Sequence, residues 1–375
     1  MRLWLAAILL AGPLAGQGRF ARFDRDLSEI RTELRIPGLA AAVVESGRVV
    51  WRKDYGGVTG TTGFLIGSLA ETMIAVEVMK LAEKGRLSLD QQVSELPPGA
   101  TIRRVLSHTA DGVPGDEFLY HDDFFNFVTP LVDKPAATLT ILDLAKFAIE
   151  LDRASLAVGK SKAAMFTPVK SPHGKTLPCG LGWFSQTYAN QSVVWNFGQT
   201  GDSSGLLLKI PARKLTLIAL ANSKVMSETA HLEDGNVARS VVALAFLKDL
   251  GHSGDFERDE LVNRALVAFY FGKREESAAI LRETFGKFPD LESSNDVTLL
   301  DLVAQLQMRE TESCATAVFQ LWPYYPPAWF RYGMYLLKER RYREAGVSFE
   351  QITEHRPPWH HWSVEVANKE LTKLQ

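Results

Sequence analysis

The sequence predicts an α+β protein, in which an antiparallel β-sheet flanked by helices is followed by an all-α repeat domain. Two groups of β-rich runs support the first part, one before residue 55 and one between residues 180 and 221. A helical pattern lies between them. Strands early, helices in the middle and strands late are typical of an α+β layout with a mainly antiparallel sheet. After residue 254 the strand pattern stops and helical segments repeat.

The first strands are predicted to form a hairpin. The β-rich runs Leu39–Val44 and Val49–Arg52 flank the turn-forming pair Ser46-Gly47. A helix is predicted next, over Ser68–Lys84, because apolar residues recur there at helical spacing and Gly85 follows as a terminator.

The second group of strands supplies the rest of the sheet. Four β-rich runs are predicted as strands: Gly180–Gln186, Ser192–Asn196, Gly205–Ile210 and Leu215–Ala221. The last two are separated by the sequence PARK at residues 211–214, a plausible tight turn. Such short connections favour antiparallel neighbours.

The C-terminal part repeats with a fixed period. Pro289, Pro323 and Pro357 are spaced 34 residues apart, and similar stretches, GKREESAAILRETFGKFP and ERRYREAGVSFEQITEHRP, precede two of them. This period resembles that of tetratricopeptide repeats, whose helix pairs stack because no pair can bury its apolar face alone. We therefore predict domains at residues 19–252 and 255–375. Such a stack would offer a peptide-binding surface, with Asn263, Tyr270, Tyr332 and Tyr335 as candidate contacts.

The N-terminus has the layout of a secretory signal peptide over residues 1–18. Its sequence, MRLWLAAILLAGPLAGQG, combines Arg2, a short apolar core and small turn-forming residues. We expect an exported protein, periplasmic or extracellular, with no membrane span in the mature chain. The two cysteines, Cys179 and Cys314, are expected to be small buried hydrophobes.

Composition excludes one class of partner and suggests no prosthetic group. The net charge is -2 and no long basic run occurs, so nucleic acid is not an expected partner. The adjacent pair His360-His361 is weak ground for a metal site. We predict neither a metal nor a cofactor.

Several separated segments of the first domain occur in a characteristic order: IPGLAAAVVESGRVVWRKDYG, FLIGSLAETMIAVEVMKLAEKGRLSLDQQV, IRRVLSHTADGVPGDEFLY, LTILDLAKFAIELD, and GLGWF followed by WNFGQTGDSSGLLLKIPARKLTLIALAN. Over roughly residues 25–250 the chain resembles the serine β-lactamase-related family, which includes class C β-lactamases, penicillin-binding peptidases and esterases. The resemblance implies a β-lactamase/transpeptidase-like fold, with the active site between the sheet and a helical subdomain.

The resemblance also implies three catalytic motifs: Ser-x-x-Lys at a helix start, Tyr-x-Asn, and His-x-Gly or Lys-Thr-Gly on a strand. The corresponding positions of this chain are Ser68, Glu71, Tyr120, Asp122, Asn196 and Gly198. Ser68, Tyr120 and Gly198 fit the motifs, whereas the other three positions differ. Only 19 residues separate Asp122 from Leu142, so a shortened subdomain and a shallower cleft are predicted.

Glu71 changes the chemistry expected at Ser68. A serine hydroxyl needs a neighbouring base, and a carboxylate at a helix N-terminus is held ionised and is only weakly basic. Its negative charge also opposes a phenolate at Tyr120. Ser-x-x-Glu at a helix start predicts instead a capping box, which stabilises a helix by about 1 kcal/mol.

The favoured interpretation is an exported β-lactamase-related protein with degenerate motifs. It would act by binding a cell-wall-like or ester ligand in the cleft, or a protein or peptide partner on the repeats. One alternative is an active serine hydrolase of the β-lactamase, D-Ala-D-Ala peptidase or esterase type, working through an acyl-enzyme at Ser68. Another is a structural interaction protein in which the first domain is a relict.

Overall fold

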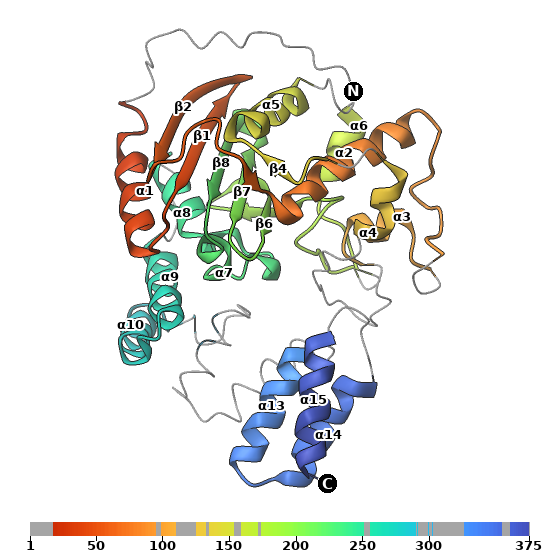
Figure 1. Cartoon of the computed structure of the whole chain (residues 1–375), viewed down its shortest axis with the longest axis vertical. Coiled ribbons are helices and arrows are strands. Elements are labelled where there is room, and N and C mark those ends of the chain that lie inside the picture. The colour runs from red at the N-terminus through yellow and green to blue at the C-terminus, as the bar shows by residue number, and fades with distance from the viewer. Residues whose placement is uncertain are drawn as a thin grey trace.

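A computed structural model of the chain provides the coordinates (Figure 1). The structure describes residues 18–94, 99–109, 125–132, 135–153, 159–171, 174–250, 256–289, 291, 299, 302, 326–354 and 361–374. The predicted signal sequence up to residue 17, the site candidates Tyr120 and Asp122, Cys314 and His360 lie outside the described residues.

The centre of the molecule is a six-stranded antiparallel sheet with the order β2-β1-β8-β7-β6-β5. The strands are β1 (Leu39–Glu45), β2 (Arg48–Tyr55), β5 (Phe184–Tyr188), β6 (Gln191–Gln199), β7 (Ser204–Ile210) and β8 (Leu215–Ala221). The predicted hairpin and the late strands are confirmed. β5 begins four residues later than predicted, because a turn with Gly182 at φ +74° occupies its expected start.

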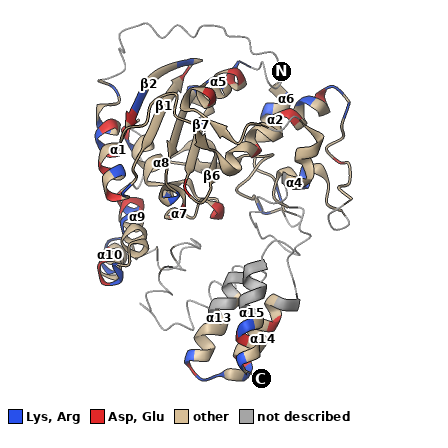
Figure 2. Ribbon diagram, in the orientation of Figure 1, with Lys and Arg blue, Asp and Glu red and all other residues tan. Residues whose placement is uncertain are grey.

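Helices cover both faces of the sheet, which confirms the predicted fold class. They are α1 (Ala21–Glu33), α2 (Ala70–Glu83), α3 (Ile102–Leu106), α4 (Phe125–Val128), α5 (Ile141–Asp152), α6 (Gly159–Phe166), α7 (Val225–Glu228) and α8 (Val241–Asp249). A small two-stranded sheet pairs β3 (Phe64–Leu65) with β4 (Thr138–Leu139). Figure 2 shows charged residues mainly on the helices, and β8, with the sequence LTLIALA, has none.

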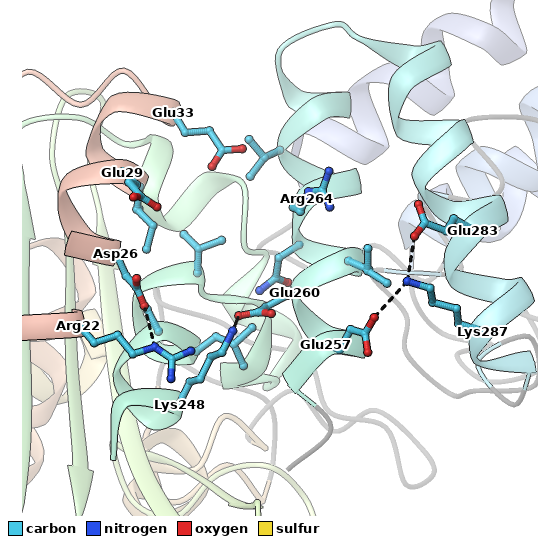
Figure 3. A pocket seen from close by; sticks show the side chains of 17 residues that line it. Arg22, Asp26, Glu29, Glu33, Lys248, Glu257, Glu260, Arg264, Glu283 and Lys287 are labelled. Carbon is cyan, nitrogen blue, oxygen red and sulfur yellow. Dashed lines mark hydrogen bonds and ion pairs between the residues drawn. The ribbon is translucent and has the colours of Figure 1, made fainter. Parts of the chain in front are cut away.

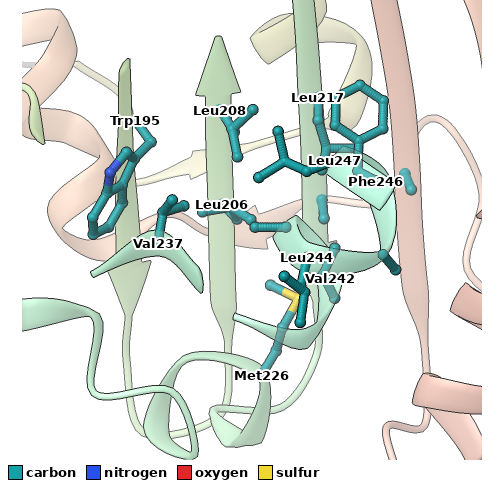
Figure 4. Packing of buried hydrophobic residues seen from close by; sticks show 14 of the residues in the cluster. Trp195, Leu206, Leu208, Leu217, Met226, Val237, Val242, Leu244, Phe246 and Leu247 are labelled. Carbon is teal, nitrogen blue, oxygen red and sulfur yellow. The ribbon is translucent and has the colours of Figure 1, made fainter. Parts of the chain in front are cut away.

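Strand alternation divides the core into two layers. Leu39, Ala41 and Val43 of β1 point into the layer that contains α1 and α8. The alternate residues of β1, which are Ala40, Ala42 and Val44, point into the layer that contains α2, α3, α5 and α6. Figure 4 shows the first layer, where side chains of α8 pack on those of β6, β7 and β8. The sheet is therefore buried on both faces, which explains its long apolar strands.

The first helix after the predicted domain boundary, α9 (Phe256–Tyr270), packs against the first domain. Asp259 accepts hydrogen bonds from Arg239 and from the Tyr188 hydroxyl, the latter at 2.6 Å. Asn263 donates to the carbonyl of Ala238 at 2.9 Å. Arg239, Asp259 and Asn263 are all buried. The elements on either side of residues 252–255 therefore share a buried polar network.

These contacts correct one of the proposed peptide-binding residues, Asn263, and involve a second, Tyr270. Asn263 is only 2% exposed and its amide is directed into the first domain. The Tyr270 hydroxyl donates to Glu228 of α7 at 2.5 Å. Asn263 is therefore covered by the first domain, whereas Tyr270 is still exposed and only its hydroxyl is engaged by α7.

The C-terminal region is helical in its described parts, with α9 paired to α10 (Arg274–Lys287), and α13 (Pro326–Lys338) paired to α14 (Tyr342–Glu354), followed by α15 (His361–Leu374). The starts of α10 and α14 lie 68 residues apart, twice the predicted period. Buried positions recur at the same offset: Ser277 with Ala345, Leu281 with Phe349, and Thr284 with Ile352. The second helices of the two hairpins, α10 and α14, therefore bury equivalent positions.

Candidate functional site

Ser68 lies in a short 3-10 helix, Gly67–Leu69, which runs directly into α2. Its side chain is half-buried and lines a cavity of about 350 Å³. The other described lining residues are Leu65, Ile66, Gly67, Ala70, Glu71, Ile74, Asn126, Thr129, Pro135, Ala137, Gln199 and Thr200. The position predicted for a nucleophile is thus at a cavity wall.

Two glycines allow the sheet to approach Ser68 closely. A Cβ on Gly198 of β6 would lie 1.9 Å from the carbonyl oxygen of Ile66. A Cβ on Gly205, its partner on β7, would lie 2.6 Å from Cδ1 of Leu69. A side chain at Gly198 would displace the turn that carries Ser68, and one at Gly205 would displace the Leu69 side chain. We call this contact between Gly198, Gly205 and the turn the glycine seat.

Glu71 does not form the predicted capping box. Neither the 3-10 helix nor α2 has a side-chain hydrogen bond at its cap, because Ser68 lies within the helical segment rather than before it. The Glu71 carboxylate is instead buried, and its Oε2 lies 3.6 Å from Nε2 of His108. A capping box of the predicted kind does form in this chain, between Thr140 and Asp143 at the start of α5.

His108 is fixed in place by its surroundings. It follows α3 with a left-handed backbone, φ +52°, and is 2% exposed. Its ring stacks on Phe184 with a centroid distance of 6.3 Å. Sequence reasoning did not connect His108 with Glu71, since the two are distant along the chain and belong to different helical segments.

Asn196, at the predicted histidine position, does not line the cavity. It is buried, donates to the carbonyl of Gly182 at 3.1 Å and accepts from the amide of Phe197 at 2.6 Å. Gly198 has a packing role in the glycine seat. The structure thus brings Ser68, Glu71 and Gly198 together, while Asn196 braces the loop before β5.

The described cavity wall carries little charge. Glu71 carries its only ionisable side chain, and the polar groups that accompany it are the amides Asn126 and Gln199 and the hydroxyls of Ser68, Thr129 and Thr200. These amides and threonines were not predicted as site residues. Among the described residues, no cluster of three or more metal-ligating side chains occurs.

Residues 23–129 match the family model described as Beta-lactamase. Penicillin-binding protein 4 of Amycolatopsis lactamdurans is 34% identical over 114 residues, covering 26% of this chain and 30% of that protein. Protein flp of Staphylococcus aureus (strain N315) is 30% identical over 100 residues, covering 22% of this chain and 20% of that protein. The matched segments thus span less than a third of either relative.

Among solved structures, the octameric penicillin-binding protein homologue from Pyrococcus abyssi has the same fold. The TM-score is 0.52 at 18% identity, and the alignment covers 64% of this chain and 81% of that one. Residues 23–129 are thus similar to the Beta-lactamase family model, and the chain shares the β-lactamase/penicillin-binding-protein-like fold.

Proposed function

We propose that the Ser68 cavity binds a small ligand without forming an acyl-enzyme, so that this domain is a degenerate member of its fold family. The observation that carries the proposal is the position of Glu71. Where the family pattern has a lysine, this chain has a buried carboxylate beside His108.

Acylation of Ser68 would need a group that removes the hydroxyl proton. Glu71 is the nearest candidate in sequence, but its Oε2 lies beside Nε2 of His108, 3.6 Å away, and a carboxylate is a weak base toward a serine hydroxyl. Asn196 offers no proton acceptor to the cavity, because its side chain is directed to Gly182 and Phe197. These contacts favour binding over catalysis.

The charge of the cavity wall suggests which ligands it accepts. A carboxylate ligand would meet Glu71 and no cation among the described lining residues. We therefore propose a neutral or positively charged ligand with an apolar body, which would contact Leu65, Ile66 and Ile74. Benzylamine, benzyl alcohol and benzoate form a size-matched set that separates the three charge states.

Labelling tests the absence of acylation. Full-length protein would be treated with a fluorescent fluorophosphonate and a fluorescent penicillin, with the Ser68→Ala variant as control. The proposal predicts no covalent label above that of Ser68→Ala. Label that is present in the wild type and lost in Ser68→Ala would overturn it.

Ligand-observed NMR with the benzyl set tests binding. We expect signals from benzylamine and benzyl alcohol, weaker signals from benzoate, and a smaller difference in Glu71→Gln. Loss of all signals in a Ser68→Trp variant, which fills the cavity, would locate the binding. Preferential binding of benzoate would contradict the ligand class without restoring acylation.

The second candidate function is an active serine hydrolase. It is favoured by one observation, that Ser68 and Glu71 line the same cavity. In that case Glu71 would accept the Ser68 proton, and hydrolysis of p-nitrophenyl acetate would be lost in both Ser68→Ala and Glu71→Gln.

Export and partner binding complete the proposal. We propose that residues 1–18 direct export, which N-terminal sequencing of protein recovered outside the cytoplasm would test. We also propose that the C-terminal helices are tetratricopeptide repeats that bind a partner. The rings of Tyr332 and Tyr335, 6.4 Å apart on α13, remain candidate contacts.

A further inference from the structure

A second cavity, of about 510 Å³, lies between the first domain and the first C-terminal hairpin (Figure 3). One wall is α1, the opposite wall is α9 with the end of α10, and the floor is α8. We call it the α1–α9 groove. It is separate from the Ser68 cavity and shares no lining residue with it.

Packing on both sides fixes the width of the groove. Phe23 of α1 packs edge-on against Phe246 of α8, with ring centroids 5.2 Å apart. The buried Arg239–Asp259 pair holds α9 against the same domain. Beyond the ends of the two walls, the Arg35 guanidinium stacks over the ring of Phe271 at 4.7 Å. The groove is therefore preformed, which reduces the entropic cost of binding.

The floor and the lower walls are apolar. The side chains that form them are Ile30, Val241, Leu244, Ala245, Leu261 and Val267. The rim is charged, with the six carboxylates Asp26, Glu29, Glu33, Glu257, Glu260 and Glu283 against the four cations Arg22, Lys248, Arg264 and Lys287. An occupant would need both apolar and positively charged groups.

Most of the cations are already engaged within the walls. Lys248 pairs with Glu260, and Arg22 lies 4.0 Å from Asp26. Lys287 is shared by Glu257 at 3.1 Å and Glu283 at 3.0 Å. Figure 3 shows Glu29 and Glu33 on the α1 wall, and neither takes part in these pairs. The excess negative charge is thus concentrated on α1.

The spacing of these two carboxylates suggests the form of the occupant. Residues four apart on a helix place their Cβ atoms about 5–6 Å apart. In an extended peptide, side chains two residues apart lie on the same side and about 6.6 Å apart. Two basic side chains at alternate positions could therefore reach Glu29 and Glu33, while the residues between and beside them contact the apolar surface.

We propose that the α1–α9 groove binds an extended peptide segment of a partner protein, with two basic residues at alternate positions and apolar residues around them. Charge complementarity and the apolar floor select this occupant. The burial that raises the pKa of Asp26 indicates that the rim near the floor is partly shielded from water, where a charge pair is worth more than on an open surface.

The test measures fluorescence anisotropy of rhodamine-labelled peptides with the full chain. The lysine probe is Leu-Lys-Leu-Lys-Leu, and the controls replace both lysines by glutamate or all three leucines by serine. We expect binding of the lysine probe alone. The Glu29→Lys/Glu33→Lys variant should weaken it about tenfold or more, since two exposed pairs become repulsive.

A matched variant distinguishes loss of the groove carboxylates from a general effect of net charge on affinity. Glu275→Lys/Glu339→Lys makes the same change in net charge at exposed positions outside the groove, and should alter affinity less than about twofold. An equal loss of affinity for the lysine probe in the two variants would overturn the proposal. So would binding of the serine or glutamate probe as tight as that of the lysine probe, or no binding of the lysine probe at all. Self-association would also overturn the proposal if it depends on Glu29 and Glu33 and is not displaced by the lysine probe. That result would identify a second copy of the chain as the occupant of the groove.

Discussion

Gly198 and Ile66 are in backbone contact, and a Cβ on the glycine would lie 1.9 Å from the Ile66 carbonyl oxygen. This contact joins strand β6 to the turn that carries Ser68. Because the obstructing atom belongs to the backbone, it cannot move by a change of rotamer. The position of Ser68 therefore depends directly on the absence of a side chain at residue 198.

Gly198→Ala should lower the free energy of unfolding by about 2–3 kcal/mol, the usual cost of overpacking a tight contact. Gly201→Ala is the control, since a Cβ there meets nothing within 4 Å and the residue lies in the turn directly after β6. Urea denaturation of both variants checks the prediction. Equal stability of the two would show that the turn can shift at little cost.

Glu71→Lys should destabilise the protein by about 3 kcal/mol or more, because it removes one member of a buried pair and sets a cation against His108. Glu71→Gln should cost less, since an amide of nearly the same shape sets no cation against His108. We also expect Glu71→Lys to hydrolyse p-nitrophenyl acetate faster than Glu71→Gln, and this gain should disappear when Ser68→Ala is added. A wild type faster than both variants would identify Glu71 as a working base.

Asp152→Ala should cost about 3–5 kcal/mol, because it leaves the buried Lys209 ammonium without its carboxylate 2.9 Å away. Burial lowers the pKa of Lys209, so the unfolded chain binds more protons than the folded one. Stability of the variant should therefore rise with pH until lysine's ordinary pKa near 10.4 is passed.

The control for this prediction is Lys162→Ala, which removes the more exposed partner of Asp152, 3.5 Å away, and should have little effect. Thermal unfolding between neutral and alkaline pH measures all three proteins. If the stability of Asp152→Ala does not rise with pH, Lys209 remains protonated in the fold and its pKa is not lowered there.

A fragment of residues 19–252 should be less stable than one of residues 19–289, because the shorter chain exposes Arg239 and loses Phe256 and Val267 from the core. In the longer fragment, Asp259→Ala should reproduce much of the loss, about 3 kcal/mol. Circular dichroism with urea compares the three. Equal urea midpoints for the two wild-type fragments would show that packing of α9 contributes little to the stability of the first domain.

Local patterns in the sequence account for most of the fold. β-rich runs and turn residues predicted the positions of β1, β2, β7 and β8, because β1, β7 and β8 are buried on both faces and the turns that join these strands are short. The start of β5 was less well predicted, since the turn at Gly182 interrupts an otherwise β-rich run.

The site was harder to predict because its contacts join distant segments. The Ser68–Glu71 pattern fits a capping box by spacing alone, but the choice between the helix end and His108 depends on how α2 and α3 pack. The inward direction of Asn196 and the cover of the first domain over Asn263 likewise follow from tertiary packing. None of these contacts has a signature in local sequence.

The glycine seat has a consequence for how such a protein can change over time. It holds Ser68 through a main-chain contact at Gly198 and side-chain packing of Leu69 at Gly205, and neither contact involves position 71. Proton-transfer residues can thus be exchanged one at a time while the architecture around the serine persists. An ancestral activity could disappear, or a new one arise, by substitution at very few positions on an unchanged scaffold.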